Sequence, residues 1–182
     1  RDEEALIMIE RALAIDERHA NSWGKLGQIY RSMGKYRESI DPYRKATTLN
    51  KEYAWAWNGY GLSLKAMGQL EEAIHAFKKA IKFQPNTLWH WYNLTEALVE
   101  TDRYYEALEP AQEAVRVDPK HVPSWGKLGQ VQRKLNRLDA ALESYSKAVE
   151  LDPTFDWAMN GKGLVLENMG RYEEALESYK QA

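Results

Sequence analysis

One period runs along this chain and constrains its fold more than any other feature. Tryptophans recur every 34 residues, at Trp23, Trp57, Trp91 and Trp125. Alanines keep the same step, at Ala46, Ala80, Ala114, Ala148 and Ala182, and so do Pro85, Pro119 and Pro153. A fixed period of this length is typical of repeat proteins, in which each unit is too small to bury its own apolar face and packs on the next.

Each period contains the pattern of two helices. In residues 54–67, and again in 70–83, apolar residues recur at steps of three and four, which places them on one helix face. Gly68 lies between the two segments, where a residue that tolerates positive φ can end a helix. Pro85 follows the second segment and disfavours its continuation. The period therefore predicts a helix, a turn, a second helix and a short proline turn.

The full set of spaced residues resembles the tetratricopeptide repeat. Its first complete copy carries the family's positions at Trp23, Leu26, Gly27, Tyr30, Gly34, Tyr36, Tyr43 and Ala46. The resemblance implies an all-α fold, a right-handed superhelical solenoid of antiparallel helix pairs. We expect a single solenoid over residues 1–182, with 1–19 as the second helix of a preceding repeat. Its repeats are expected at 20–53, 54–87, 88–121 and 122–155, with a truncated one at 156–182.

Composition narrows the possible functions. The formal net charge is -2, so no whole-molecule field attracts nucleic acid or an anionic membrane. Cysteine is absent, and the four histidines show no metal spacing, so we expect no metal, no cofactor and no catalytic residue. The charged start of the chain is unlike a signal peptide, and no apolar run is long enough to span a bilayer. These features favour a cytoplasmic, non-enzymatic protein.

Helix packing explains the small residues and predicts where it changes. Glycine at Gly27, Gly61, Gly129 and Gly163 lets a large neighbour approach closely. In the third repeat, Thr95 replaces this glycine and Ala111 replaces a large aromatic residue, which predicts looser or altered packing. Pro42 and Pro110 fall inside second helices and predict kinks.

A longer period of 102 residues, three repeats, is also present. The segment SWGKLGQ occurs at 22–28 and again at 124–130. We therefore expect the first and fourth repeats to present similar surfaces, and likewise the second and fifth.

The resemblance also implies a binding surface, because first helices line the concave face in this family. The matching positions that we assign to ligand binding are Gln28, Arg31, Trp55, Asn58, Lys65, Trp89, Tyr92, Gln130, Arg133, Trp157 and Asn160. Trp55, Trp89 and Trp157 stand where a polar residue is usual. They are either anchors for an extended peptide, with amides to pair its backbone, or extra core between repeats.

The leading hypothesis is a scaffold that binds a peptide or protein segment in its concave groove. One alternative is a regulatory or sensor arm of a larger multidomain protein. Another is end-to-end self-assembly, because the chain begins within a helical hairpin and leaves Leu6, Ile9 and Leu13 without a partner helix, as expected of a segment of a longer array. RNA binding is disfavoured, since no basic stripe is present.

Overall fold

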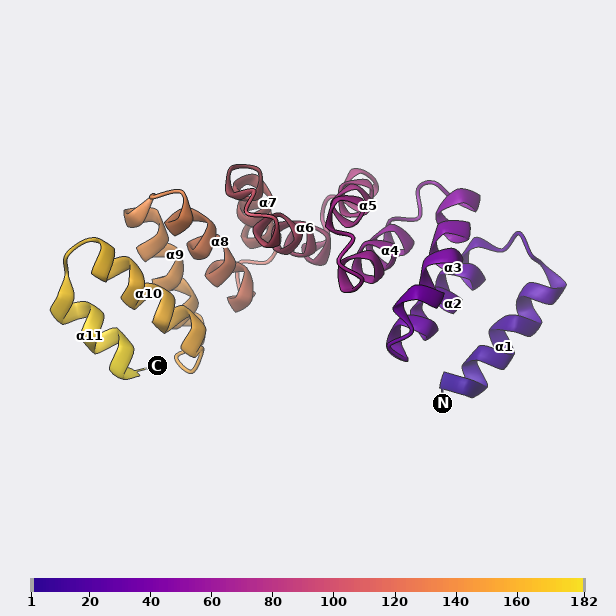
Figure 1. Cartoon of the computed structure of the whole chain (residues 1–182), viewed down its shortest axis with the longest axis horizontal. Helices are drawn as coiled ribbons and strands as arrows, with labels where there is room; N and C mark the ends of the chain where they lie inside the picture. Colours follow the sequence, from indigo (N-terminus) through magenta and orange to yellow (C-terminus); the bar gives the residue numbers. More distant parts are fainter. Residues whose placement is uncertain (1, 182) are drawn as a thin grey trace. The chain divides into compact units, whose positions relative to one another are not determined.

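The structure, a computed structural model, describes residues 2 to 181, which form eleven helices and no strand. In chain order the helices are α1 Asp2–Ile15, α2 Ala20–Ser32, α3 Tyr36–Leu49, α4 Ala54–Ala66, α5 Leu70–Phe83, α6 Leu88–Glu100, α7 Tyr104–Val117, α8 Val122–Lys134, α9 Leu138–Leu151, α10 Asp156–Asn168 and α11 Tyr172–Gln181 (Figure 1). The expected all-α class is confirmed, and the two predicted helices of the second repeat match α4 and α5. Within residues 2 to 181, no helix is long and apolar enough to cross a membrane.

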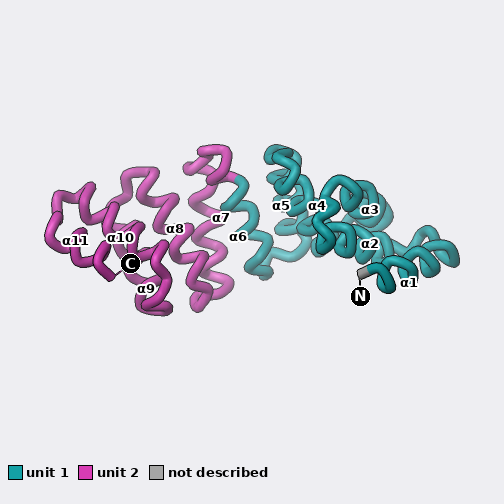
Figure 2. The backbone as a smooth tube through the Cα atoms, turned by 60° about the horizontal axis from the view of Figure 1, so that its bottom comes forward, with its two compact units in different colours: residues 1–97 teal, residues 98–182 magenta. Residues whose placement is uncertain are grey.

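The chain divides into two compact units, residues 1–97 and 98–182, and the division falls inside α6 (Figure 2). In the first unit α2 packs on α3, α3 on α4, and α4 on α5. In the second unit α7 packs on α8, α8 on α9, α9 on α10, and α10 on α11. Each unit is thus a run of helix pairs, and the expectation of one array over the whole chain remains a prediction.

A left-handed residue separates the two helices of each pair. Gly68 has φ 75°, as its place between the predicted helices requires, and Gly34 and Gly170 have φ 72° and 75°. The same phase holds Asp102 at φ 55° and Asn136 at φ 57°. Aspartate and asparagine are the side chains that best tolerate this region, so the turn keeps its form without glycine.

The spaced tryptophans hold the turn that precedes each first helix. Each indole Nε1–H donates a hydrogen bond to the backbone carbonyl six residues earlier, from Trp23 to Glu17 at 2.7 Å, Trp57 to Lys51 at 2.8 Å, Trp91 to Pro85 at 2.6 Å and Trp125 to Pro119 at 2.9 Å. Each accepting carbonyl belongs to a turn residue two positions after the preceding helix ends. The 34-residue tryptophan period therefore reflects a repeated hydrogen bond to the turn as well as apolar packing.

The glycines of the first helices face aromatic rings of the second helices. A Cβ on Gly27 would lie 2.8 Å from the Tyr43 ring, and one on Gly59, in the next first helix, 2.5 Å from it. Tyr145 lies in the same way between Gly129 and Gly161, where the distances would be 2.9 and 2.3 Å. The close approach that the sequence predicts is thus made by a ring, and each ring joins two successive helix pairs.

The third repeat differs in composition, and its parts fall on both sides of the division between the units. Thr95 and Ala111 are both buried, each 1% exposed. The Thr95 hydroxyl donates a hydrogen bond of 2.9 Å to the carbonyl of Trp91 in its own helix, so burial leaves it a partner. Altered packing at this repeat remains a prediction.

Two further expectations concern prolines and the first helix. Pro42 and Pro110 lie buried inside α3 and α7, which continue past them; the predicted kinks remain a prediction. In α1, Leu13 is buried rather than unpartnered, because α1 packs on α2. The expected apolar face was therefore misassigned: the exposed apolar side chains of α1 are Ile7, Met8 and Ile15.

Candidate functional site: the first-helix surface

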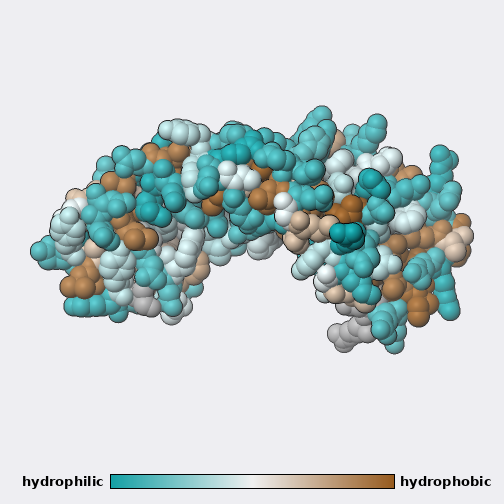
Figure 3. Space-filling view, in the orientation of Figure 1, coloured by the Kyte–Doolittle hydropathy of each residue, from teal (hydrophilic) through white to brown (hydrophobic). Residues whose placement is uncertain are grey.

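The helices that open each pair are α2, α4, α6, α8 and α10, and we call the face of these helices that carries the predicted ligand-binding residues the first-helix surface. We treat it separately in the two units. All predicted ligand-binding residues lie on these helices: in the first unit Gln28 and Arg31 on α2, Trp55, Asn58 and Lys65 on α4, and Trp89 and Tyr92 on α6; in the second unit Gln130 and Arg133 on α8, and Trp157 and Asn160 on α10. In the view of Figure 3, apolar residues form small separate patches among hydrophilic ones.

Trp55 is half-buried in an aromatic cluster. Its ring stacks on Tyr53 with centroids 5.7 Å apart and meets Tyr43 edge-on at 6.4 Å. A Cβ on Gly24, in the preceding first helix, would lie 3.2 Å from the Trp55 ring. The Lys25 ammonium lies over the same ring, 4.9 Å from its centroid. Trp55 therefore packs between repeats and still carries a cation on its outer side.

Trp157 repeats this cluster in the second unit. Its ring lies 5.8 Å from Phe155 and 6.3 Å from Tyr145, both edge-on. Gly126 again leaves the space, since a Cβ there would lie 2.4 Å from the indole. Lys127 lies 5.2 Å over the ring. Trp157 is nevertheless 40% exposed, so packing uses only part of its surface.

Trp89 has the same phase as Trp55 and Trp157 but a different environment. The residue 31 positions before it is Asn58 instead of glycine. Trp89 is 54% exposed, and its ring lies edge-on to Tyr92 at 6.1 Å. A glycine of the preceding first helix thus lies beside Trp55 and Trp157, and no glycine has that position beside the more exposed Trp89.

Polar side chains of α4 and α6 pair with one another within the first unit. Asn93 Nδ2 donates a hydrogen bond of 3.0 Å to Asn58 Oδ1. Lys65 forms an ion pair of 2.7 Å with Glu96, and both side chains are largely covered. Burial raises the pKa of Tyr92 to about 12, and the nearby Glu96 carboxylate adds to the rise. Tyr92 is therefore a neutral hydrogen-bonding group at physiological pH.

Several polar atoms of the surface lack a protein partner. Arg31 Nε, Arg133 Nε and Gln130 Oε1 are buried without a hydrogen bond within residues 2–181, and so is the Tyr43 hydroxyl. Burial raises the pKa of Tyr43, while Arg31 opposes the rise. Burial likewise raises the pKa of Tyr145, against the effect of Arg133. An unsatisfied buried polar group costs about 1 to 3 kcal/mol.

The remaining predicted residues lie at the edges of these clusters. Gln28 is half-buried and its Oε1 accepts a hydrogen bond of 3.2 Å from Lys25, whereas Asn160 is exposed. Sequence reasoning missed Lys25 and Lys127 as parts of the clusters. Their signal was present, because both lie in the repeated SWGKLGQ segment.

Chemistry of other kinds finds little support. Among residues 2–181, no group of three or more His, Asp or Glu side chains is placed to hold a metal ion. His90 is buried, and burial lowers its pKa to about 4, so it is neutral at physiological pH. The arrangement that remains is one of aromatic rings, amides and a few cations, which suits recognition of a polypeptide.

Comparison with known families agrees with the repeat pattern. A family model described as "TPR repeat" matches residues 27–68 and 129–170, and one described as "Tetratricopeptide repeat" matches residues 54–87. Comparison with curated protein sequences gives no match.

Solved structures share the fold at low sequence identity. The crystal structure of YrrB, described as "a TPR protein with an unusual peptide-binding site", has a TM-score of 0.87 and 22% identity, and covers 95% of this chain and 89% of its own. A crystal structure of MamA has a TM-score of 0.81 and 24% identity, with 86% and 91% covered. MamA from Desulfovibrio magneticus gives 0.83 and 21%, with 89% and 92% covered. The likeness extends over most of each chain.

Proposed function

We propose that this chain, which belongs to the tetratricopeptide repeat family and has its solenoid fold, binds a peptide or protein segment on its first-helix surface. The family's fold supports a role as a protein–protein interaction scaffold. The finer claim is that Trp89 is the main anchor of the first unit, with Trp55 as a secondary one, and that Trp157 is an anchor of the second unit. The amide and guanidinium groups of each unit orient the ligand there.

The exposure of Trp89 is the observation that carries this proposal. Trp89 is 54% exposed, and a partner that covers its ring removes apolar surface from water, which favours binding. Tryptophan loses little conformational entropy when it is immobilised, which makes it a frequent anchor of interfaces. Asn58 on α4 is half-buried, and its amide group is of a kind that pairs with a peptide backbone.

Half-buried polar side chains add a second reason. Arg31, Gln130 and Arg133 are predicted contact residues, and part of each side chain is accessible to solvent. A ligand backbone can form hydrogen bonds with the accessible guanidinium and amide groups of these side chains. These groups therefore favour a polar main chain over a purely apolar ligand.

The similarity to YrrB agrees with this proposal. YrrB is described as having an unusual peptide-binding site, and its fold matches this chain over 95% of the sequence. A peptide is accordingly the first ligand class to test, and an enzymatic role is not part of the proposal.

The test is selection of peptides from a random library against the chain, followed by binding measurements with variants. Trp89→Ala is expected to weaken a selected peptide at least about tenfold, since loss of a central anchor typically costs about 2 kcal/mol or more. Because Trp89 is exposed, the helical circular dichroism of the Trp89→Ala variant should stay near that of the original chain.

The matched control is Tyr105→Ala. Tyr105 is 82% exposed and lies on α7, which is a second helix. Tyr105→Ala therefore removes an exposed aromatic ring that does not belong to the first-helix surface. If Trp89→Ala, Trp55→Ala and Trp157→Ala all bind the selected peptides as tightly as the Tyr105 variant does, the anchor assignment is wrong.

A further inference from the structure

A groove of the first unit is lined by residues of both first and second helices. It has a volume of about 670 Å³ and is lined from α3, the following turn, α4 and α5, by Arg44, Thr47, Thr48, Lys51, Trp57, Tyr60, His75, Lys79, Lys82 and Phe83. We call it the α3–α5 groove. All its lining residues belong to the unit 1–97. None of the predicted ligand-binding residues lines it, so the proposed function does not account for it.

The lining of this groove is cationic. It contains Arg44, Lys51, Lys79 and Lys82 and no aspartate or glutamate. Along α5, the residues three and four positions from Lys79 and Lys82 include no carboxylate that could pair with them. Within residues 2–181, Lys51, Lys79 and Lys82 form no ion pair. Like charges that share a groove repel one another, and an anionic ligand relieves this repulsion.

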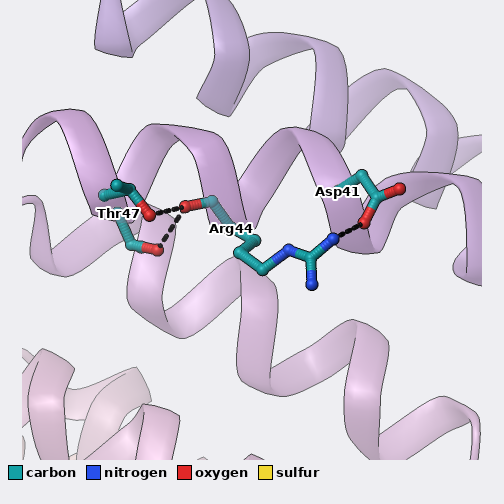
Figure 4. A network of polar contacts seen from close by, with 4 residues as sticks. Asp41, Arg44 and Thr47 are labelled. Carbon is teal, nitrogen blue, oxygen red and sulfur yellow. Dashed lines mark hydrogen bonds and ion pairs between the residues drawn. The ribbon is translucent and has the colours of Figure 1, made fainter.

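Arg44 differs from the three lysines, as Figure 4 shows. Its guanidinium extends along α3 to Asp41, with which it forms an ion pair of 2.5 Å. The hydroxyls of Thr47 and Thr48 donate hydrogen bonds to the Arg44 carbonyl, at 3.1 and 2.8 Å. The Asp41 carboxylate therefore balances the charge of Arg44. The remaining positive charge of the groove comes from Lys51, Lys79 and Lys82.

Comparable grooves elsewhere in the chain have a different charge. The groove that includes Trp23, of about 600 Å³, contains Glu17 and Asp41 beside its cations. The groove that includes Trp125, of about 420 Å³, contains Glu143, Glu150 and one cation, Lys147. Three repeats after Lys51 and Lys79 the chain has Pro153 and Gln181. The cationic lining is therefore not a property of the repeat itself.

Aromatic rings form the apolar part of the α3–α5 groove. Trp57 and Tyr60 have ring centroids 6.3 Å apart, and both are half-buried. Phe83 lies at the end of α5, with the Lys82 ammonium 5.6 Å from its ring centroid. The groove thus offers apolar surface beside its lysines.

We propose that the α3–α5 groove is a second interaction surface, which binds an acidic peptide segment with an apolar residue next to its carboxylates. Charge complementarity with the three lysines identifies the acidic part, and the rings of Trp57, Tyr60 and Phe83 identify the apolar part. A peptide is favoured over nucleic acid for two reasons. The lysines lie in one groove and do not form the extended basic stripe that follows a phosphate backbone, and the chain as a whole has a net charge of -2.

The test is fluorescence anisotropy with a labelled peptide that contains Glu-Glu-Leu-Glu-Glu. The intact chain is expected to bind it, and the double variant Lys79→Glu, Lys82→Glu to bind at least about tenfold more weakly, because two attractive charges become repulsive. Lys51→Glu, in the turn after α3, should also weaken binding without any change in a helix. Trp89→Ala should leave binding unchanged, which separates this surface from the first-helix surface.

Two controls complete the experiment. Lys120→Glu with Lys180→Glu makes the same change in net charge at exposed positions of the other unit, and should bind the peptide like the intact chain. A peptide with glutamine in place of glutamate should not bind. The proposal is overturned if the double variant at Lys79 and Lys82 binds the acidic peptide as the intact chain does, or if a thymidine oligonucleotide binds this groove more tightly than the peptide.

Discussion

The aromatic clusters around Trp55 and Trp157, one in each unit, are close copies, whereas Trp89 at the same phase is not. Trp55 lies 5.7 Å from Tyr53 and Trp157 lies 5.8 Å from Phe155, and each carries a lysine over its ring. Both indoles contact a glycine of the preceding first helix. Asn58 occupies that phase before Trp89, which stays more exposed. Residues of the neighbouring repeat and of the preceding turn thus accompany the difference between a more covered and a more exposed tryptophan.

The grooves of the two units also differ in charge. The first unit carries the α3–α5 groove, whose lining has three lysines and Arg44 and no carboxylate, whereas the groove at Trp125 in the second unit contains two glutamates. These two grooves are not copies of each other, because the residue three repeats before Trp125 is Trp23, so the charge of a groove is a property of its own repeat.

The largest expected effect concerns the rings that join the helix pairs. Tyr43→Ala and Tyr145→Ala should each lower the free energy of unfolding by about 3 to 5 kcal/mol, the usual cost of removing a large buried ring. Both rings are fully buried between two glycines, at 0% and 2% exposure, so the costs should be similar. Urea denaturation of the two variants checks this. A cost below about 1 kcal/mol for either ring would break the equivalence of the two clusters.

The buried His90 of the first unit should make the stability of the chain sensitive to acid. Burial lowers the pKa of His90 from 6.5 to about 4, so the unfolded chain binds a proton in this window that the folded chain does not. Stability due to neutral His90 is complete above pH 6.5 and falls as the pH drops towards 4, by at most on the order of 3 kcal/mol.

Urea denaturation of the chain and of His90→Ala, as a function of pH, measures this contribution. Alanine is the natural choice, because Ala56 and Ala158 occupy the same phase. The variant should lose part of the slope between pH 6.5 and 4, whatever its absolute stability. Identical slopes for the two proteins would contradict the assignment to His90.

Glycine substitutions sharpen the comparison at a smaller scale. A Cβ on Gly161 would lie 2.3 Å from the Tyr145 ring, so Gly161→Ala should cost about 1 to 3 kcal/mol through overpacking. At Gly24 the nearest ring atoms would lie 3.0 and 3.2 Å away, and small shifts suffice. Gly24→Ala should therefore be nearly neutral, helped by the higher helix propensity of alanine. Equal losses of thermal stability for the two variants would show that the ring contact does not set the cost.

The smallest expected effect is that of Tyr43→Phe. The Tyr43 hydroxyl is buried without a hydrogen bond, and Phe77 occupies the same phase one repeat later. Removal of an unsatisfied hydroxyl should change stability by less than about 0.5 kcal/mol, in either direction. A loss above about 1 kcal/mol in urea denaturation would indicate that Arg31 and this hydroxyl form a real bond.

The period and its chemistry made most of the fold predictable from the sequence. Helix spacing, Gly68 and Pro85 located α4 and α5 to within one residue at their ends. The sequence analysis did not predict the left-handed residues Asp102 and Asn136, because it assigned this turn position to glycine. The division of the chain inside α6 had no sequence signal beyond the altered residues of the third repeat.

The candidate site was less predictable, for a physical reason. Its positions follow from the repeat phase, and all of them lie on first helices, but exposure depends on the neighbour across the repeat interface. Trp55, Trp89 and Trp157 have the same sequence phase, and their neighbours distinguish them: a glycine 31 positions earlier and an aromatic residue two positions earlier at Trp55 and Trp157, but Asn58 and Thr87 at Trp89. The unpartnered atoms of Arg31, Gln130 and Arg133 depend on side-chain geometry that no spacing encodes.

The seven tryptophans provide the most direct test of the central claim, that the first-helix surface binds a polypeptide. In a two-dimensional NMR spectrum each indole N–H gives one signal, which single Trp→Phe variants assign. Addition of a selected peptide should shift the signals of Trp55, Trp89 and Trp157. The signals of Trp23, Trp57, Trp91 and Trp125, whose N–H groups are bound to turn carbonyls, should stay in place. Shifts confined to those four, with Trp89 unmoved, would contradict the account.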